Sequence, residues 1–423
     1  MIRASALYMV IVIALVIGLL CSSLVVVAYY YRLQDQKMSR IMQLQTNLSS
    51  GVAILLASQD ISSNTEEKTF SLFGGDRDTV SIKKIPWGGY EVGAVRAMIQ
   101  KDTLYKTFTI ANEVDSSKWG VLYLADEDRP VSVSGKSVIK GDAYLPKAGA
   151  KAAYINNAAY EGDKNIVTGK IHNSNKTIPA LDTKRLSQIE HLFDQPVKAD
   201  TNLVMADSVK NSFLAAAHVF DLRRKAVTLS NIKLEGNIVL HSDTSIIIEP
   251  SATLNQVIIT AKYIHVKAGF QGTCQLFATD SLTIEKNCNF FYPSCIGLHR
   301  LKSYSFSVPP HIFIGEQTQV QGLVFGWDKN FNAQKAPIIT LAKNVTIAGQ
   351  VYSQGYVELN NGVMVKGNLT TKRFLYQSGY TRYENYIINT KLDETQLSRY
   401  YLTSDLMPVS SSKRKVLQWL ESN

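Results

Sequence analysis

Cysteine and charge are both scarce in this chain of 423 residues. The four cysteines are too few for a disulfide scaffold and lack the spacing of zinc ligands. Charged residues make up 19%, below the roughly 25% of typical soluble domains. With 25 glycines and 11 prolines the chain is neither collagen-like nor a flexible linker. Hydrophobic residues reach 45%, which is enough for a sizeable core and excludes an intrinsically disordered chain.

Acidic residues are fewer than basic ones. The chain has 45 Lys and Arg against 35 Asp and Glu, a net charge of +10. This excess is compatible with an anionic partner, whether DNA, an acidic polysaccharide or lipid headgroups, and does not select one of them.

The start of the chain has a long stretch without any charge. From Ser5 to Tyr30 there are 26 uncharged, mostly apolar residues. A bilayer core of ~30 Å needs about 20 apolar residues in a helix, so this stretch can span it. A cleaved signal peptide would have an apolar region of only about 7–15 residues. Leu20 directly before Cys21 disfavours a lipoprotein signal. We therefore expect a retained, single-pass transmembrane helix with the lipid bilayer as a partner.

The flanking charges leave the orientation of this helix open. Arg3 precedes the apolar stretch, whereas Arg32, Lys37 and Arg40 follow it. The positive-inside rule alone would place the large domain in the cytoplasm, but long domains are translocated largely regardless of flanking charge. We expect a protein of the bacterial inner membrane whose large domain is periplasmic or extracellular.

Helical periodicity continues beyond the apolar stretch. Apolar residues recur at steps of three and four residues, at Ile41, Leu44, Leu48, Val52 and Leu55. One helix from about Ser5 to about Ala57 would be ~80 Å long. Its first half would be uniformly apolar and its second half amphipathic, as in an anchor that continues into a stalk.

This two-part helix resembles the N-terminus of type IV pilin-like subunits. Met1–Ala4 is similar to their short basic leader, with Ala4 where the family usually has glycine. Most members carry glutamate at the fifth position of the mature helix, where this chain has Met9. Minor, tip-located pilins and K-type pseudopilins lack that glutamate, and this N-terminus resembles theirs most. The resemblance implies processing before Ser5 and a place in a pilus-like assembly.

After the helix the apolar pattern changes to a period of two. Alternating runs occupy Val80–Ile85, Tyr90–Ile99, Leu104–Ile110 and Trp119–Leu124, with a turn at Pro86–Gly89. Four short alternating runs predict an antiparallel β-meander packed on the stalk helix.

An internal repeat of eighteen residues dominates the rest of the chain. Apolar residues recur at this spacing in two blocks, in the sets Leu240, Ile258 and Leu276; Ile246, Ile264 and Leu282; Ile248, Val266 and Ile284; Ile339 and Val357; Leu341 and Leu359; Ile347 and Val365. A shared pattern surrounds glycines that we place at corners, Gly141, Gly236, Gly349 and Gly367. Eighteen residues divide into three faces of about six, which predicts a triangular parallel β-solenoid. It resembles the bactofilin-type solenoid in coil length and in its Val and Ile ladders.

The predicted fold is therefore mainly β. We expect a transmembrane and stalk helix over 1–57, an antiparallel meander over 58–130, and a solenoid over 131–372. The solenoid is expected to be interrupted by about 148–225, with a helix around Thr183–Phe193, and again from about Gly297 to Pro310. Residues 373–423 are expected to cap the solenoid, with a short amphipathic helix over Lys413–Glu421.

Catalytic arrangements are missing from the predicted solenoid. Asp243 and Asp280 have no carboxylate at the equivalent positions of neighbouring coils, and Glu249 and Glu285 are separated by Lys267 in a column that we interpret as a solvated charge ladder. The seven histidines, His172, His191, His218, His241, His265, His299 and His311, show no metal-like spacing. We predict no enzyme activity, no catalytic, cofactor-binding or metal-ligating residues, and no cofactor.

The three solenoid cysteines have a different interpretation. Cys288 continues an apolar column and is predicted to be a core thiol. Cys274 and Cys295 flank it, which leaves open a disulfide or a paired thiol.

These observations favour a non-catalytic bacterial envelope protein. In the first hypothesis it is a membrane-anchored, pilin-like or minor-pseudopilin-like subunit that displays a β-solenoid for assembly or adhesion, with protein partners in a pilus-like assembly. The first alternative is a membrane-tethered, bactofilin-like cytoskeletal scaffold. The second is a solenoid that binds polysaccharide or DNA.

Overall fold

The computed structural model describes two compact units. The described residues are 2–58, 67–72, 74, 78–155, 157–194, 207–222, 226–300, 308–379 and 381–422. Unit 1 comprises Met1–Lys84, Gly93–Thr107 and Trp419–Asn423, and unit 2 comprises Ile85–Val92 and Phe108–Gln418. Parts of the expected interruptions, at 195–206, 223–225 and 301–307, lie outside the described residues, as does Tyr380.

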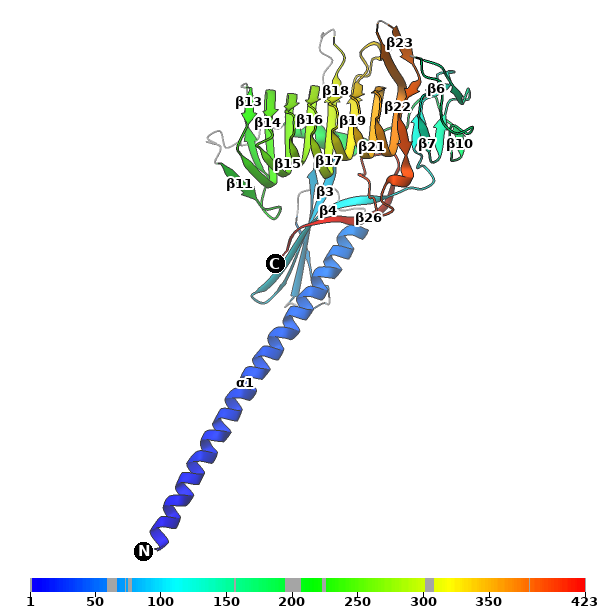
Figure 1. The fold of residues 1–423 in the computed structure, drawn as a ribbon. Coiled ribbons are helices and arrows are strands. Elements are labelled where there is room, and N and C mark those ends of the chain that lie inside the picture. The colour runs from blue at the N-terminus through cyan, green and yellow to red at the C-terminus, as the bar shows by residue number, and fades with distance from the viewer. Residues whose placement is uncertain are drawn as a thin grey trace. The chain divides into compact units, whose positions relative to one another are not determined.

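Unit 1 is built on one long helix, α1, which spans Ile2–Ala57 without a break (Figure 1). Its second half is amphipathic as predicted, because Leu44, Leu48, Val52 and Leu55 are buried on one side while Met42, Gln45 and Ser49 on the other side are exposed. Gly51 faces Val80 and Val95, and a Cβ at this position would lie 2.8 and 2.7 Å from their methyl carbons. The absence of a side chain at Gly51 therefore permits the close approach of helix and sheet.

The sheet that packs on α1 has five strands in the order β1-β2-β3-β4-β26. β1 runs antiparallel to β2. The bounds are Lys68–Phe70 for β1, Asp78–Trp87 for β2, Tyr90–Ile99 for β3, Asp102–Val114 for β4 and Ser410–Ser422 for β26. The predicted fourth strand over Trp119–Leu124 is absent from this sheet: its final residues form β5 (Leu122–Leu124), which belongs to the solenoid.

The C-terminal strand β26 contradicts the predicted helix over Lys413–Glu421. The segment pairs with the edge of β4, where Asn112 Nδ2 donates a hydrogen bond of 2.8 Å to the carbonyl oxygen of Ser411. Unpaired backbone groups of β4 would otherwise remain at the edge, and pairing with them outweighs the weak local preference of the segment for a helix.

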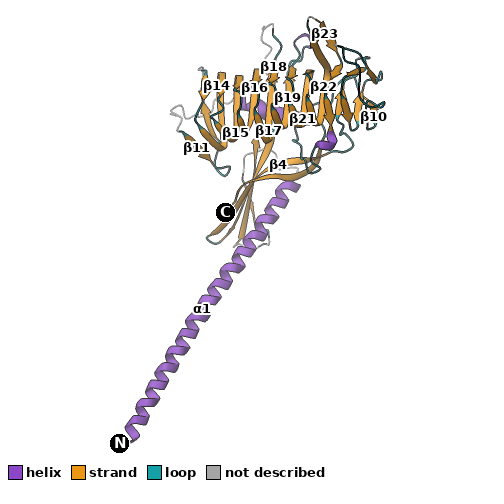
Figure 2. Cartoon of the chain, in the orientation of Figure 1, coloured by secondary structure: helices purple, strands orange, loops and turns teal. Residues whose placement is uncertain are grey.

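Parallel strands make up most of unit 2 (Figure 2). The strands before the long coils are β5, β6 (Val131–Ser134), β7 (Val138–Lys140), β8 (Ala143–Leu145), β9 (Ala150–Ala152), β10 (Ile171–Asn173), β11 (Ser208–Asn211), β12 (His218–Asp221) and β13 (Val227–Leu229). The long coils follow as β14 (Lys233–Ile248), β15 (Thr253–Val266), β16 (Gln271–Ile284), β17 (Asn289–Arg300), β18 (His311–Ile314), β19 (Gln319–Asp328), β20 (Ile338–Leu341), β21 (Thr346–Leu359) and β22 (Met364–Ser378). The last are β23 (Thr381–Glu384), β24 (Tyr386–Ile388) and β25 (Lys391–Asp393), with helix α2 at Thr183–Asp194 and 3₁₀ turns at Ala333–Lys335 and Glu394–Gln396.

The eighteen-residue repeat is visible in the strand register. Ile246 pairs with Ile264, and Ile264 pairs with Leu282 on the next coil. The same offset joins Ile347 to Val365 across β21 and β22. These side chains are buried inside the coils, so the repeat stacks apolar residues into continuous internal columns, as the sequence predicted.

One predicted column is shifted by a residue. Leu240 pairs with Ile259 rather than with Ile258, and Ile259 pairs with Leu276. The cause is a register irregularity before each of these pairs, at the corner that contains Gln256 with φ +61°. Between β14 and β15 the offset is 20 residues on the first face, where Leu234 pairs with Leu254, 19 on the second, and 18 on the third, where Ile246 pairs with Ile264.

The coils do not stack in the order of the chain. β5 pairs with β22, and β8 in turn pairs with β5, so the first coil of the solenoid lies beside the last long coil. β25 likewise pairs with both β22 and β7. The tail beyond residue 372 therefore supplies strands inside the stack instead of a terminal cap. Figure 1 shows the long coils from β14 to β22 in sequence, followed by β7 and β10.

Candidate functional site

The apolar half of α1 has the length and composition to cross a membrane. None of the residues in its most apolar window is buried, and Leu7, Met9 and Leu15 are each more than 60% exposed. Exposed Val, Ile and Leu on every side of a helix are unfavourable in water and favourable in hydrocarbon. This stretch is accordingly the candidate anchor.

After Arg3, the next charged residues lie where the anchor ends. Arg32, Asp35 and Lys37 lie on exposed turns of α1, and Arg40 forms an ion pair with Asp102 at 3.1 Å. Further along, Asn47 is fully buried and donates a hydrogen bond of 3.1 Å to Asp78. Within a few turns, α1 therefore changes from a stretch of exposed apolar residues to a stretch whose polar side chains contact the sheet.

Three of the solenoid carboxylates weighed as catalytic candidates, Asp243, Asp280 and Glu285, have cationic or histidine neighbours. Glu285 Oε1 lies 3.1 Å from Lys267 Nζ and 2.8 Å from His265 Nε2. Burial raises the pKa of Glu285, but hydrogen bonds from Lys267, the Ala268 N–H and His265 outweigh it and lower that pKa below its ordinary value. The carboxylate is thus held ionised, as in a charge ladder.

Asp243 and Asp280 are in similar surroundings. Asp243 Oδ1 is 3.3 Å from His241 Nε2, and Asp280 Oδ2 is 3.6 Å from Lys262 Nζ. Each of these two carboxylates therefore lies beside a histidine or a lysine. Glu249 follows β14 and Glu285 follows β16, so the coil of β15 lies between them.

The histidines and cysteines are dispersed. Among the described residues, no three His, Cys, Asp or Glu side chains are grouped so as to hold a metal ion. Cys274, Cys288 and Cys295 are free, buried thiols, so the disulfide left open by the sequence is not formed. Burial raises the pKa of the Cys274 and Cys295 thiols far above the usual value, which keeps them neutral and unreactive.

A buried ion cluster that the sequence did not indicate joins three segments of unit 2. Arg185 on α2 lies 3.0 Å from Glu91 and 2.6 Å from Asp405, and its side chain is 2% exposed. It also donates a hydrogen bond of 3.0 Å to the carbonyl oxygen of Tyr90. The cluster fixes the hairpin residues Ile85–Val92 and helix α2 in unit 2, which is a structural role.

Comparison with known proteins gives one solved structure to report. No protein-family model and no curated protein matches the chain. The chain is similar to the competence-associated pilin ComZ from Thermus thermophilus, with 7% identity over 84% of this chain and 86% of that one. The TM-score is 0.25, which is too low to establish a common fold. The functional proposal below therefore depends on the residues of this chain.

Proposed function

We propose that this protein is a non-catalytic, membrane-anchored, pilin-like subunit of a bacterial envelope assembly. The proposal rests on the difference between the two halves of α1. Its first half exposes apolar side chains on every side, and its second half buries Leu44, Leu48 and Leu55 against an antiparallel sheet. A helix of this kind can be held in the membrane, or among helices of other subunits, while its sheet remains in water.

The solenoid supplies the part that such a subunit would display. Its interior is a continuous apolar core, and Asp243, Asp280 and Glu285 are each paired with a lysine or a histidine. A rigid surface built on stacked coils suits assembly or adhesion, with the large domain on the periplasmic or extracellular side.

The strands at both ends of the stack disfavour the bactofilin-like scaffold. At one end β9 and β10 have three residues each, and at the other end β11, β12 and β13 have three or four. Short edge strands offer few backbone groups to a second copy, so they oppose end-to-end polymerisation.

N-terminal mass spectrometry tests the pilin-like proposal. Coexpression with a prepilin peptidase is expected to give a chain that begins at Ser5. The matched variant Ala4→Leu, which places a bulky residue at the processing site, is expected to remain full length. An unprocessed wild-type chain would leave only an ordinary signal anchor.

Protease accessibility tests the location of the solenoid. In spheroplasts of cells that express the full chain, added protease is expected to digest the solenoid. Protection of the solenoid until the membrane is opened would contradict the proposed location and favour the cytoplasmic scaffold.

A further inference from the structure

A ladder of aromatic rings runs along one outward face of the solenoid. Tyr123 on β5, Tyr144 on β8 and His172 on β10 occupy the same register position on successive coils. The ring centroids of Tyr123 and Tyr144 are 5.4 Å apart, those of Tyr144 and His172 are 4.9 Å apart, and both pairs are inclined by 25°. Each ring therefore covers a face of its neighbour.

The ladder is interrupted at a single coil. On its other side Tyr123 pairs with Thr370 of β22, which has no ring. Rings resume on the following coils, because Thr370 pairs with Tyr352 and Tyr352 pairs with Phe325. Parallel strands are ~4.8 Å apart, so the coil of Thr370 leaves space in the column for about one ring.

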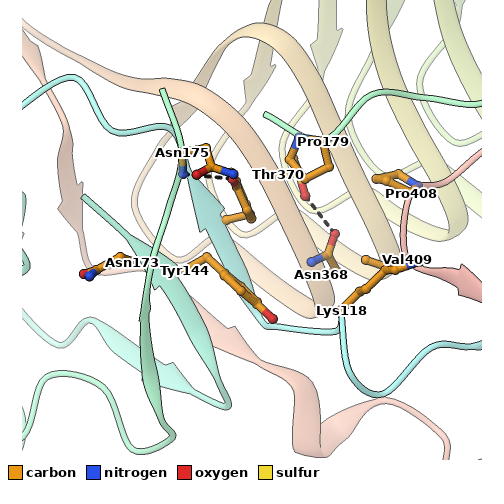
Figure 3. Close-up of a pocket in the computed structure, with 10 residues that line it drawn as sticks. Lys118, Tyr144, Asn173, Asn175, Pro179, Asn368, Thr370, Pro408 and Val409 are labelled. Atoms are coloured by element: carbon orange, nitrogen blue, oxygen red, sulfur yellow. Dashed lines mark hydrogen bonds between the residues drawn. The ribbon is translucent and has the colours of Figure 1, made fainter. Parts of the chain in front are cut away.

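A cavity of about 210 Å³ lies at this interruption (Figure 3). It is lined by the end of the ladder and by polar and proline side chains, namely Lys118, Tyr123, Tyr144, Asn173, Asn175, Pro179, Asn368, Thr370, Pro408 and Val409. At ~30 Å³ per water molecule it has the volume of about seven waters, below the roughly 300–1,000 Å³ of sites for larger ligands. A single six-membered ring with its substituents is of this size.

Hydrogen bonds hold the rings and the deep wall of the cavity in place. The Asn175 N–H donates to the Tyr123 hydroxyl at 3.1 Å, and the Tyr144 hydroxyl donates to the carbonyl oxygen of Ser117 at 3.2 Å. Thr370 Oγ1 donates to Asn368 Oδ1 at 3.1 Å. The site is thus organised before any ligand binds, which lowers the entropic penalty of binding.

The rim offers neutral polar groups. Asn173 and Asn175 are exposed, and their side-chain amides make no hydrogen bond to the residues that the structure describes. Lys118 is the one cation of the lining, and it pairs with Asp115 at 3.3 Å. A site for the phosphates of a nucleic acid would need several unpaired cations, so the lining favours a ligand that is ring-shaped, uncharged or weakly charged, and rich in hydroxyls.

We propose that this cavity binds one pyranose unit of a glycan. The C–H face of a pyranose packs on an aromatic ring, here the face of Tyr123 that is turned to Thr370, and an equatorial hydroxyl can pair with the amide of Asn175, whose N–H is bonded to the Tyr123 hydroxyl. Thr370 leaves the ring position in the ladder open for the sugar. The inference goes beyond the proposed assembly function, because binding is measurable whether or not the chain is processed or enters a filament.

Titration of the full chain in a phosphocholine detergent tests the proposal, because maltoside detergents would supply pyranoses themselves. The probes are the methyl glycosides of glucose, galactose, mannose, N-acetylglucosamine and glucuronic acid, with a twelve-residue oligothymidylate as the nucleic-acid probe. Saturation-transfer NMR is expected to show binding of at least one glycoside with a Kd of about 1 mM. Binding of none of them would overturn the proposal.

Three variants connect the binding to the cavity. Thr370→Tyr fills the ring position and is expected to weaken binding at least about tenfold. Asn175→Ala changes only an exposed amide, so it keeps the test valid if Thr370→Tyr does not fold; a similar loss is expected. Tyr263→Ala, at a 43% exposed ring on β15, is the matched control and is expected to bind as the wild type does. Unchanged glycoside binding in the amide variant would show that the sugar does not bind in this cavity. Oligothymidylate binding that the cavity variants abolish would show that the ligand class is wrong.

Discussion

Gly349 lies at a corner where two coils come into close contact. Its φ is +146°, and a Cβ built on it would lie 2.0 Å from the carbonyl oxygen of Gly322 on the neighbouring coil. Gly367 repeats this relation to Gly349, with φ +147°. Any side chain would both strain the backbone and clash with a carbonyl that cannot move without breaking its ladder. This geometry explains the corner glycines that the sequence pattern indicated.

Gly349→Ala should therefore lower stability by about 2 kcal/mol or more, since strain and clash add. Gly269→Ala is the matched control, because Gly269 has φ +84° but open space around its Cα. It should lose only the strain contribution of about 1 kcal/mol. Thermal melts of both variants in detergent measure the difference, and equal losses would show that the clash is unimportant.

Val365 and Lys366 test the inward and outward alternation of β22. Val365 is fully buried between Ile347 and Leu392, whereas Lys366 is half-exposed. Val365→Asp places an unpaired charge in the apolar column and should cost about 3–5 kcal/mol. Lys366→Asp should change stability by less than about 0.5 kcal/mol. Two variants that melt alike would contradict the assignment of the two faces.

His299 makes stability depend on pH. Its ring is fully buried against Trp327, with centroids 4.9 Å apart, and neither ring nitrogen has a hydrogen-bond partner among the described residues. Burial, assisted by the nearby Lys329, lowers the pKa of His299 to about 4. The unfolded chain, with a pKa of about 6.5, takes up the proton first. Stability contributed by neutral His299 is thus present above pH 6.5 and is lost as the pH falls towards 4.

This loss should amount to about 3 kcal/mol across that pH window. His299→Phe keeps the packing and cannot be protonated, so its melting temperature should fall less between pH 6.5 and 4. His311 contributes in the same direction, because burial lowers its pKa as well, so some slope remains in the variant. A variant whose pH profile matches that of the wild type would exclude His299 as the source.

At the level of elements, the sequence predicted the features that depend on residues close together in the chain. The helical stripe of α1, the helix around Thr183–Phe193 and the eighteen-residue columns depend on neighbours within one or two turns or one coil. The order of the coils depends on pairs such as Leu122 with Leu369, which are far apart in the sequence. Both residues are ordinary buried aliphatic side chains, and nothing in their local pattern distinguishes one partner coil from another. The cavity beside Tyr123 could not be predicted for the same reason.

The strand β26 likewise could not be predicted from local sequence, because its partner strand is far away in the chain. Its apolar residues fit a short amphipathic helix nearly as well as a strand, and only the edge of β4 decides between them. Deletion of Ser410–Asn423 should expose that edge, lower the melting temperature and promote self-association. Light scattering after size-exclusion chromatography in detergent measures the association state. Lys415→Ala, which removes only an exposed ion pair with Glu113, is the matched control and should leave that state unchanged.

At the scale of the whole molecule, the solenoid is not a separable C-terminal piece. Gly89 donates a hydrogen bond of 2.8 Å from its N–H to Gln275 Oε1, and Gln275 Nε2 donates one of 3.0 Å to the carbonyl oxygen of Trp87. The hairpin residues Ile85–Val92 and the strand β5 thus belong to unit 2. A fragment that begins near residue 130, which the sequence boundaries would have selected, lacks both. Experiments on the solenoid therefore require a chain that keeps both of these segments.

An uncharged position in α1 bears on the proposed assembly. Met9 is 66% exposed on the helix, and no charged residue occurs from Ser5 to Tyr30. A lone carboxylate in a membrane is unfavourable unless it is paired, and in pilin-like filaments the amino terminus of a neighbouring subunit is the expected partner. A subunit with methionine here lacks that pairing, so it suits a terminal position in an assembly and should not propagate a homopolymer.

Overexpressed alone, the wild-type protein should therefore remain a monomer or small oligomer in the membrane. Met9→Leu, which keeps the position apolar, should behave in the same way, whereas Met9→Glu supplies the missing carboxylate and should increase association between processed chains. Electron microscopy of isolated membranes and size-exclusion chromatography in detergent measure the outcome. Long wild-type polymers would contradict the terminal role, and if they persisted after the apolar half of α1 was removed they would favour polymerisation through the solenoid ends. Because those ends carry strands of only three or four residues, we expect neither result.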